Sequence, residues 1–383
     1  MRKILKFTMP FALAVAAVLG SLGARAERIV VGQVAPLSGT EASQGRAYAA
    51  GMQMAFDAVN KAGGVNGHTF ALVSKDDRAR PEETVKLTRL LLSEQQPMVL
   101  AGYFGNSSIS ELLASGTLER ERVALLGYRA ARVDSELPFL YNVRAGLRDE
   151  LAVIVAHLAT IGLTRLGLFY EEDSGASALV ATAEELGKKS KTMIVSRASY
   201  AAGSTRVSEA IDTFLRDKPQ AIIMVCSGAA AARFIEQYRG EGGAAQLFVH
   251  SGADMERVTK EIAESRLAFV SSVMQGVVIA QVVPSPYRAS RLAKELSEAA
   301  GKSGQPGVSV SYVTMEGYIA AKVIIEAVRR QGSRPSRSGM TTALESIDNL
   351  DLGGYVVGLK QGLRRGSTLV ELTVISGTGK ILQ

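Results

Sequence analysis

The sequence predicts an α/β protein made of two doubly wound, parallel-sheet lobes. Short apolar segments of strand length alternate with segments of helical periodicity along most of the chain. This alternation restarts after Asn142-Val143-Arg144 and then runs a second time. The chain has 383 residues, of which 47% are hydrophobic and 21% charged. It is therefore globular in composition and long enough for two lobes.

The first 26 residues predict a secretory signal peptide. A basic start is followed by an uncharged apolar stretch over residues 7–20, and Ala24-Arg25-Ala26 fits the small-x-small cleavage pattern. The alternative is a membrane anchor, but the apolar stretch is too short to cross a hydrocarbon core of ~30 Å. No cysteine lies near the cleavage point to carry a lipid. We therefore expect a soluble mature chain in the periplasm, starting at Glu27.

The charge of the mature chain does not favour a nucleic-acid partner. Removing residues 1–26 removes four basic residues and no acidic one, so the formal charge falls from +7 to +3. A charge this small is not typical of nucleic-acid binding. Cys226 is the single cysteine, which excludes an intramolecular disulfide. It follows an apolar run and is expected to be a buried small hydrophobe.

The first series of elements begins with a buried strand over residues 28–35. Residues 44–62 carry apolar side chains at helical spacing, and Gly63-Gly64 ends the helix. Pro81 begins the next helix, with acidic residues in the first turn. The other elements expected in this series are strands over 69–74, 98–101 and 123–126 and a helix over 107–119.

The second series has the same alternating pattern. Because a helical segment separates each pair of successive strands, the strands are expected to be parallel. The expected helices cover 149–161, 175–188, 207–217, 229–238 and 254–263, and the expected strands cover 165–170, 193–196, 221–225 and 247–250.

The C-terminal part of the chain has a different pattern. Helices are expected over 287–300, 311–330 and 338–347, followed by a hairpin whose strands cover 355–359 and 368–375. A helical block with one hairpin is a poor basis for a third domain. We therefore expect this part to complete the two lobes, which requires several chain crossings between them.

Several segments of the mature chain resemble the leucine/isoleucine/valine-binding protein family. Members of this family are type I periplasmic binding proteins of ABC importers for branched-chain and related amino acids. The resemblance covers essentially the whole mature chain. The segments that carry it are Val34-Ala35-Pro36-Leu37-Ser38-Gly39, residues 60–67, Asp76-Asp77 up to Pro81, Phe169-Tyr170, residues 278–286 and Glu316-Gly317-Tyr318.

The resemblance implies two α/β lobes joined by three crossings, which we place near Ala145, Gln275 and Leu352. A ligand would bind in the cleft between the lobes, and the lobes would close around it by a hinge motion. The implied domains are lobe 1 (27–145 plus 276–352) and lobe 2 (146–275 plus 353–383).

In the first lobe, the resemblance implies carboxylate contacts where a short strand turns into a helix. The family places these contacts at a turn that corresponds here to Asn106, Ser107 and Ser108. Hydroxyls and free backbone N–H groups at a helix start can hold a carboxylate without a cation. The alternative is that these residues only cap the helix, a role that Asn and Ser favour.

The next turn contains Tyr128, Arg129 and Ala130. Tyr128 could form a wall of the cleft, and Arg129 could supply a positive charge suited to an acidic ligand. The alternative for Arg129 is an exposed position on a loop. Ser38 and Gln44 lie on the first loop, where the family lines the mouth of the cleft.

The second lobe departs from the family pattern. An aromatic residue often follows the strand that ends at Tyr170, but Asp173 stands there instead, and Ser227 replaces a second aromatic residue. Ser251 stands where the family has a polar or acidic residue that can hold an ammonium group. One hypothesis is a bulkier or more acidic ligand than leucine. The competing hypothesis is weak binding or none.

No pattern in the sequence indicates an enzyme, a metal site or a cofactor. The three histidines have no partner at metal-binding spacing, and Cys-x-x-Cys and G-x-S-x-G motifs are absent. The favoured function is a periplasmic receptor that delivers an amino acid or related carboxylate to the permease of an ABC importer. The alternative is a ligand sensor acting on a histidine kinase or chemoreceptor. The protein is expected to be a monomer.

Overall fold

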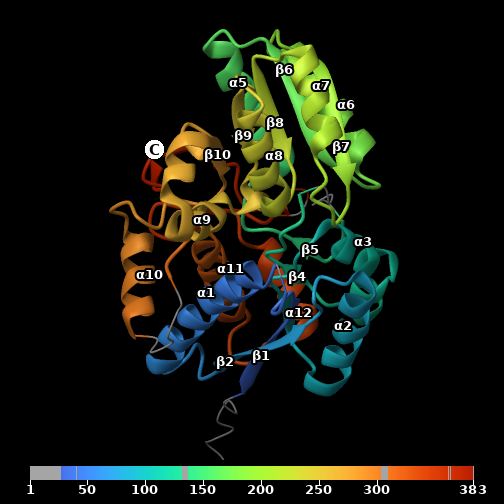
Figure 1. Cartoon of the computed structure of the whole chain (residues 1–383). Coiled ribbons are helices and arrows are strands. Elements are labelled where there is room, and N and C mark those ends of the chain that lie inside the picture. The colour runs from blue at the N-terminus through green and yellow to red at the C-terminus, as the bar shows by residue number, and fades with distance from the viewer. Residues whose placement is uncertain are drawn as a thin grey trace, which may run out of the picture.

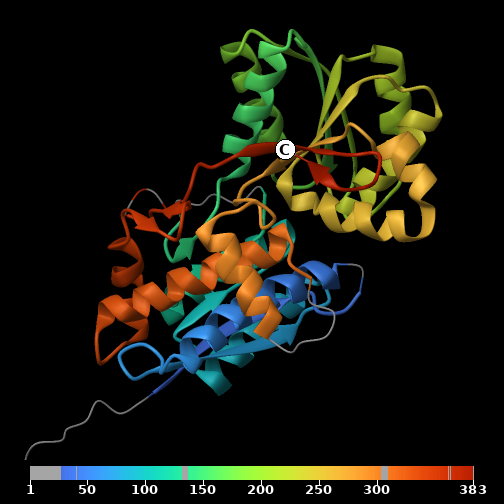
Figure 2. The same ribbon diagram turned by 90° about the vertical axis from the view of Figure 1, so that its left-hand side faces the viewer.

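The computed structural model describes residues 27–39, 41–131, 137–302, 309–360, 362 and 364–382, so the expected signal peptide lies outside the described residues. The described chain forms two α/β lobes, one above the other in Figure 1. Each lobe has its own central sheet, and the chain passes between the sheets three times (Figure 2). The predicted fold class, two parallel-sheet lobes, is confirmed.

The sheet of the first lobe has five parallel strands in the order β2-β1-β3-β4-β5. β1 is the long buried strand predicted from its apolar run. β5, which has two residues, was not predicted. The strands are β1 (Arg28–Ala35), β2 (Thr69–Asp76), β3 (Val99–Ala101), β4 (Leu125–Leu126) and β5 (Leu140–Tyr141).

Helices cover both faces of this sheet. A helix was expected over 107–119, but the structure has two, because Gly116 adopts a left-handed conformation (φ 61°) that ends the first of them. The helices are α1 (Ala42–Lys61), α2 (Pro81–Gln95), α3 (Asn106–Ala114), α4 (Thr117–Glu121), α10 (Arg291–Lys302), α11 (Tyr312–Gln331) and α12 (Arg337–Glu345).

α1 and α11 pack against each other unusually closely. A Cβ atom at Gly51 would lie 2.0 Å from the carbonyl oxygen of Thr314, and one at Gly317 would lie 2.1 Å from the carbonyl oxygen of Tyr48. Both positions therefore need glycine. This close contact fixes the cleft-facing end of α11, which carries the buried side chain of Glu316.

The sheet of the second lobe has seven strands in the order β14-β13-β10-β9-β8-β6-β7. β7, β6, β8, β9 and β10 are parallel, and β13 and β14 are antiparallel to their neighbours. The strands are β6 (Arg165–Glu172), β7 (Met193–Ala201), β8 (Ala221–Val225), β9 (Gln246–Val249), β10 (Val278–Gln281), β13 (Glu371–Ile375) and β14 (Ile381–Leu382).

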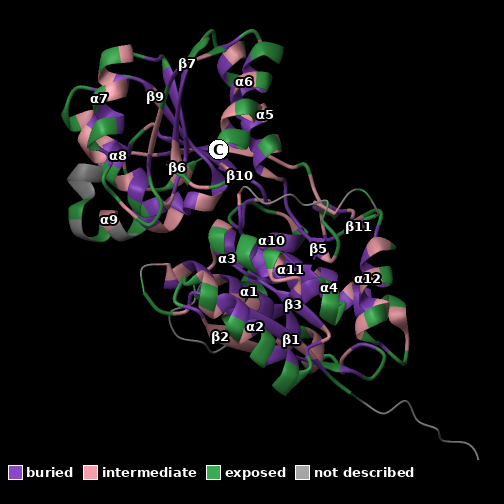
Figure 3. Cartoon of the chain, turned by 90° about the vertical axis from the view of Figure 1, so that its right-hand side faces the viewer, coloured by how far each residue is buried: buried purple, intermediate pink, exposed green. Residues whose placement is uncertain are grey.

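Helices also cover both faces of the second sheet. Figure 3 shows the strands mostly buried and the outer faces of the helices exposed, so each lobe has its own core. The helices are α5 (Leu147–Thr160), α6 (Ala176–Lys189), α7 (Ser208–Asp217), α8 (Gly228–Gly240) and α9 (Met255–Phe269), with a 3-10 turn (Ser251–Ala253) and a π-helical turn (Val270–Met274) beside α9.

Two of the three connections differ in position from the expectation. The first runs through residues 142–146, between β5 and α5. The second was placed near Gln275, but β10 pairs with β9, so the chain leaves the second sheet after Gln281. The third was placed near Leu352, but residues up to Leu359 pack in the first lobe's core, so the chain crosses between Leu359 and β13.

The predicted hairpin over 355–375 is wrong. β12 (Val356–Val357) pairs with β11 (Leu350–Asp351) beside the first lobe, whereas β13 pairs with β10 in the second. The two segments belong to different sheets because the third connection runs between them.

Candidate ligand-binding cleft

The turns that follow β3 and β4 lie side by side at the edge of the first lobe. The backbone N–H of Arg129 donates to the carbonyl of Tyr103 (2.8 Å), and that of Gly105 donates to the carbonyl of Arg129 (3.0 Å). Gly127 has φ 66°, and a Cβ atom there would lie 2.2 Å from the Tyr48 hydroxyl. Glycine thus lets Tyr48 of α1 pack beneath the turns, and the turns aim Arg129 at the second lobe.

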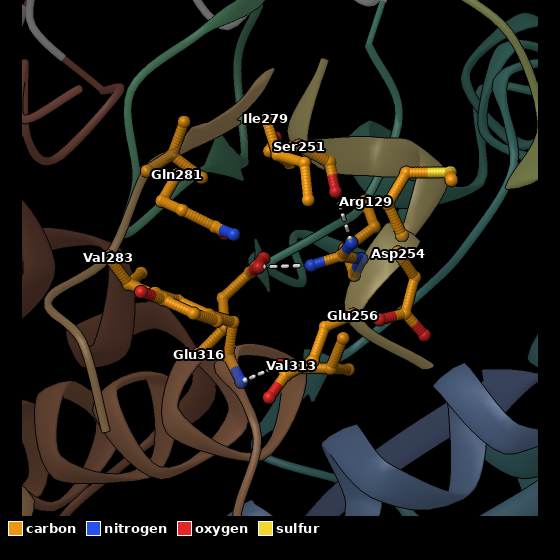
Figure 4. Close-up of a pocket in the computed structure, with 12 residues that line it drawn as sticks. Arg129, Ser251, Asp254, Glu256, Ile279, Gln281, Val283, Val313 and Glu316 are labelled. Atoms are coloured by element: carbon orange, nitrogen blue, oxygen red, sulfur yellow. Dashed lines mark hydrogen bonds and ion pairs between the residues drawn. The ribbon is translucent and has the colours of Figure 1, made fainter. Parts of the chain in front are cut away.

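Arg129 connects the two lobes. Its guanidinium forms an ion pair with Glu316 of α11 and donates to the carbonyl of Ser251 in the second lobe (3.3 Å). Figure 4 shows the Glu316 carboxylate and the Arg129 guanidinium pointing toward each other. The Arg129 side chain is 6% exposed, so it is not an exposed loop residue.

Ser251 is bound from two directions by buried charged residues. Its hydroxyl donates to Glu150 Oε1 (2.9 Å), its backbone N–H donates to Glu150 Oε2 (2.7 Å), and Arg144 donates to its hydroxyl (3.0 Å). Burial raises the pKa of Glu150, while Arg144 and the hydrogen bonds from Ser251 act in the opposite direction. The Ser251 hydroxyl is therefore committed to the protein's own interior.

The buried charges balance one another. Arg129 and Arg144 face Glu316 and Glu150, and Arg144 Nη1 lies 3.8 Å from Glu316 Oε2. Among the described residues, some polar atoms of this cluster have no hydrogen-bond partner: Arg129 Nε, Arg144 Nε, Glu316 Oε1 and the Tyr48 hydroxyl. Buried polar atoms are normally paired. The cluster is therefore a polar centre with bonding capacity left for a ligand or for water.

A cavity lies between the lobes beside Arg129. Its volume of about 10 Å³ is roughly the space of one water molecule. Asp254, just before α9, and Glu256, in α9, line it from the second lobe. Gln281 lines it from the end of β10 and Glu316 from α11. A larger ligand can therefore enter only if the lobes move apart.

A second link closes the same cavity. Glu256, in the second lobe, accepts a hydrogen bond from the backbone N–H of Tyr312 (3.0 Å), the first residue of α11. The Tyr287 hydroxyl also donates to Glu256. Hydrogen bonds thus join the lobes on both sides of the cavity.

A model of the periplasmic binding protein family matches residues 28–368. This chain belongs to that family. A substrate-binding periplasmic protein of Ralstonia solanacearum has the same fold, with a TM-score of 0.84. It is 32% identical, and the match covers 93% of this chain and 99% of that one.

Two curated relatives agree with this assignment. A Leu/Ile/Val-binding protein homologue of Brucella melitensis is 22% identical, with 91% of this chain and 88% of the relative covered. An amino acid binding protein of Pseudomonas aeruginosa is 34% identical over 97 residues, and this match spans only 25% of this chain and 26% of the relative.

Of the predicted site residues, the structure brings Arg129 and Ser251 together at the cavity. Two others lie where β1 leads into α1, Ser38 on the connecting loop and Gln44 in the first turn of the helix. Ser38 is exposed, and its hydroxyl donates to Asp76 (2.5 Å). Gln44 is buried, and its amide donates to Glu41 (3.1 Å). Both side chains hold the loop around the start of α1.

The predicted residues of the first-lobe turns lie at the edge facing the second lobe. Asn106, Ser107 and Ser108 form the first turn of α3, and the capping position is Gly105, with no side-chain capping bond. Of these three, Ser107 is exposed and Ser108 buried. Tyr128 and Ala130 are also buried, on either side of Arg129. Their roles in ligand binding remain predictions.

The predicted residues of the second lobe mostly begin helices. Asp173 accepts from the backbone N–H of Gly175 (2.8 Å), just before α6. Ser227 caps α8 by accepting from Ala230 (3.3 Å). Tyr170 packs partly against the second lobe's core. These contacts are local, and none of the three residues lines the cavity described above.

Sequence reasoning missed the residues that surround Arg129 and Ser251. Glu150 is in the first turn of α5, where an acidic residue is usual for electrostatic reasons, so nothing in the pattern marked it. Glu316 did carry a signal, because it is a charged residue on a helix whose other faces are apolar. Arg144 lies in the first connection, where the sequence has no periodic pattern.

Two other features of the described chain bear on function. The described residues include no group of three or more His, Cys, Asp or Glu side chains placed to hold a metal ion. Within the same residues, no helix combines the length and apolar character needed to cross a membrane.

Proposed function

We propose that this protein is the periplasmic receptor of an ABC importer and carries a small polar ligand, an amino acid or a related carboxylate. The ligand binds between the lobes and leaves unchanged, so the protein acts by binding and not by catalysis. The names of the relatives, which refer to amino acids, support this ligand class.

The observation that carries the proposal is the polar cluster between the lobes. Its side chains come from the first lobe, the second lobe and the first connection: Arg129 and Glu316, Ser251 and Glu150, and Arg144. Most of its bonds are internal, but several of its buried polar atoms have no hydrogen-bond partner among the residues that the structure describes. Such a centre, which is exposed when the lobes separate, suits a ligand with both donors and acceptors.

Closure of the lobes explains how binding could be signalled to a permease. Helix starts and strand ends of both lobes face the cleft, as in other α/β proteins that bind ligands at strand carboxyl ends. A ligand that contacts both lobes stabilises the closed form by the difference in its affinity for the two forms. A permease that recognises both lobes together would distinguish the loaded receptor from the open one.

A binding assay tests this function. The mature chain, residues 27–383, is unfolded to release carried ligand, refolded, and examined by thermal shift with amino acids, their deaminated carboxylates and aromatic acids. A ligand at 100 times its Kd adds about 2.7 kcal/mol to the free energy of unfolding and raises Tm by several degrees. Refolded protein with a flat response to the whole panel would contradict the proposed ligand class.

A pair of variants and an uptake assay sharpen the test. Ser107→Ala should weaken binding of a hit several-fold, because one exposed hydroxyl of the α3 start is lost. Ser93→Ala, an exposed hydroxyl on α2, is the control and should change nothing. Cells lacking the gene should fail to import the labelled hit. Normal import with a lost transcriptional or chemotactic response would indicate the sensor function instead.

A further inference from the structure

Two buried arginines share one carboxylate at the centre of the cleft. Glu316 Oε2 pairs with Arg129 and lies 3.8 Å from Arg144 Nη1, and the exposed fractions of the three side chains are 6% or less. Charges in a protein interior interact through less water than charges at the surface, so this pairing strongly reduces the field of Arg129. Arg129 therefore does not present a free positive charge to a ligand.

Helix packing holds Glu316 in this position. Its neighbour Gly317 contacts the backbone of α1 so closely that a side chain there would clash with Tyr48. The carboxylate consequently points from the start of α11 into the cavity, toward Arg129 (Figure 4).

The unpaired atoms show what kind of group the centre can accept. Glu316 Oε1 is a buried acceptor and Arg129 Nε a buried donor, and neither has a hydrogen-bond partner among the described residues. A centre with an anionic acceptor beside a cationic donor suits a group of no net charge. A lone carboxylate would instead be repelled by Glu316 at short range.

Asp254, the other carboxylate near Arg129, does not take the place of Glu316. It forms its own ion pair with Arg257 (3.3 Å). Among the residues that the structure describes, Glu316 is thus the one whose carboxylate forms an ion pair with Arg129.

From this arrangement we propose that Glu316 determines the charge selectivity of the cleft by masking Arg129. The cleft then selects a zwitterionic amino acid over the carboxylate of the same carbon skeleton, and removal of the Glu316 charge exposes an anion site on Arg129. This inference rests on the proposed function, since it assumes that the ligand binds in this cleft.

The test compares ligands that differ by one ammonium group. The pairs are leucine with 4-methylpentanoate and phenylalanine with 3-phenylpropanoate. Wild-type protein should bind the amino acid of an accepted pair about tenfold or more tightly than the carboxylate. Glu316→Gln keeps the shape of the side chain, and it should lower the Kd of the carboxylates by about tenfold or more. Its Tm should also rise at carboxylate concentrations that leave the Tm of the wild type unchanged.

Two further variants keep the test decisive. Arg129→Gln together with Glu316→Gln removes both charges and should abolish the gained carboxylate binding; an equal gain in this double variant would overturn the role of Arg129. Glu316→Asp retains the charge but shortens its reach, so it should show a smaller gain in the same direction. If Glu316→Gln does not fold, the carboxylate affinity of Glu316→Asp tests the masking instead. A folded variant of either kind with no gain would overturn the proposal.

The outcomes separate this inference from the proposed function. Wild-type protein that binds an amino acid, with a Glu316→Gln variant that gains no carboxylate binding, would refute the masking alone. Wild-type protein that binds neither member of a pair, with a variant that gains carboxylate binding, would support the masking and refute the amino-acid ligand.

Discussion

Asp254 is a carboxylate with an unusual environment in the wall of the cavity. It is 8% exposed, and burial raises its pKa from 3.8 to about 6, although Arg129 and Arg257 act in the opposite direction. The folded protein therefore binds this proton more tightly than the unfolded chain does. The stabilisation is complete below the unfolded-state pKa and is lost as the pH rises through about 6.

Asp254→Asn should remove this part of the pH dependence. As the pH falls from about 7.5 to about 4.5, protonation of Asp254 should raise the free energy of unfolding of the wild type by about 2 kcal/mol. Urea unfolding of both proteins across this range measures the effect. Burial also raises the pKa values of Glu150 and Glu256, so the relevant quantity is the difference between the two curves. Parallel curves would show that Asp254 does not titrate in this way.

At the scale of single residues, the sequence identified positions better than roles. Arg129 was expected to offer a charge to an acidic ligand, but its partner Glu316 lies 187 residues away in the sequence, and only the folded chain brings them together. Ser251 was expected to contact an ammonium group, but Glu150 and Arg144 occupy its hydroxyl. Partners this distant leave no local pattern.

Among the elements, α11 depends on the other lobe for part of its N-terminal capping. Ser311 caps the helix locally by accepting from Thr314 (3.1 Å), while Glu256 of α9 accepts from Tyr312 across the cleft. The partial positive charge of a helix start favours a carboxylate there. Glu256 therefore stabilises α11 and holds the lobes together with one side chain.

Glu256→Gln should weaken this link because the amide keeps the shape but loses the charge. We expect the free energy of unfolding to fall by about 1 kcal/mol, and the radius of gyration of the ligand-free protein to increase as the open form becomes more populated. Urea unfolding and small-angle X-ray scattering measure these two effects. Glu264→Gln, an exposed carboxylate on the same helix, is the control and should change neither. Equal effects of the two variants would disprove the link.

Most elements were predictable because their periodicity is local. The predicted strand over 221–225 has the bounds of β8, and most of the predicted helices agree with the structure to within a few residues. Strand partners were not predictable in the same way. Each residue of β10 pairs with a residue of β13 that lies 90 to 96 positions later in the sequence, so neither the second crossing nor the false hairpin could be settled from the pattern alone.

For the whole molecule, one side chain of the first lobe contacts two of the three connections between the lobes. The Tyr355 hydroxyl donates to the carbonyl of Val143 in the first connection (2.6 Å) and lies 3.3 Å from the carbonyl of Val282 in the second. Tyr355 itself precedes the third connection and is 2% exposed. Any rotation of one lobe against the other must either keep this junction as its pivot or break it.

Tyr355→Phe should loosen the pivot, because it keeps the ring but removes the hydroxyl that donates to the carbonyl of Val143 and lies near that of Val282. Interlobe distances can be followed by fluorescence transfer between dyes on cysteines introduced at Lys61 and Lys189, both exposed, since the native Cys226 is buried. The distance distribution of the ligand-free variant should be broader than that of the wild type. Tyr238→Phe is the matched control, because that hydroxyl is buried within the second lobe and accepts from Ala245. If the control broadens the distribution as much as Tyr355→Phe does, the effect is one of general stability and the pivot lies elsewhere.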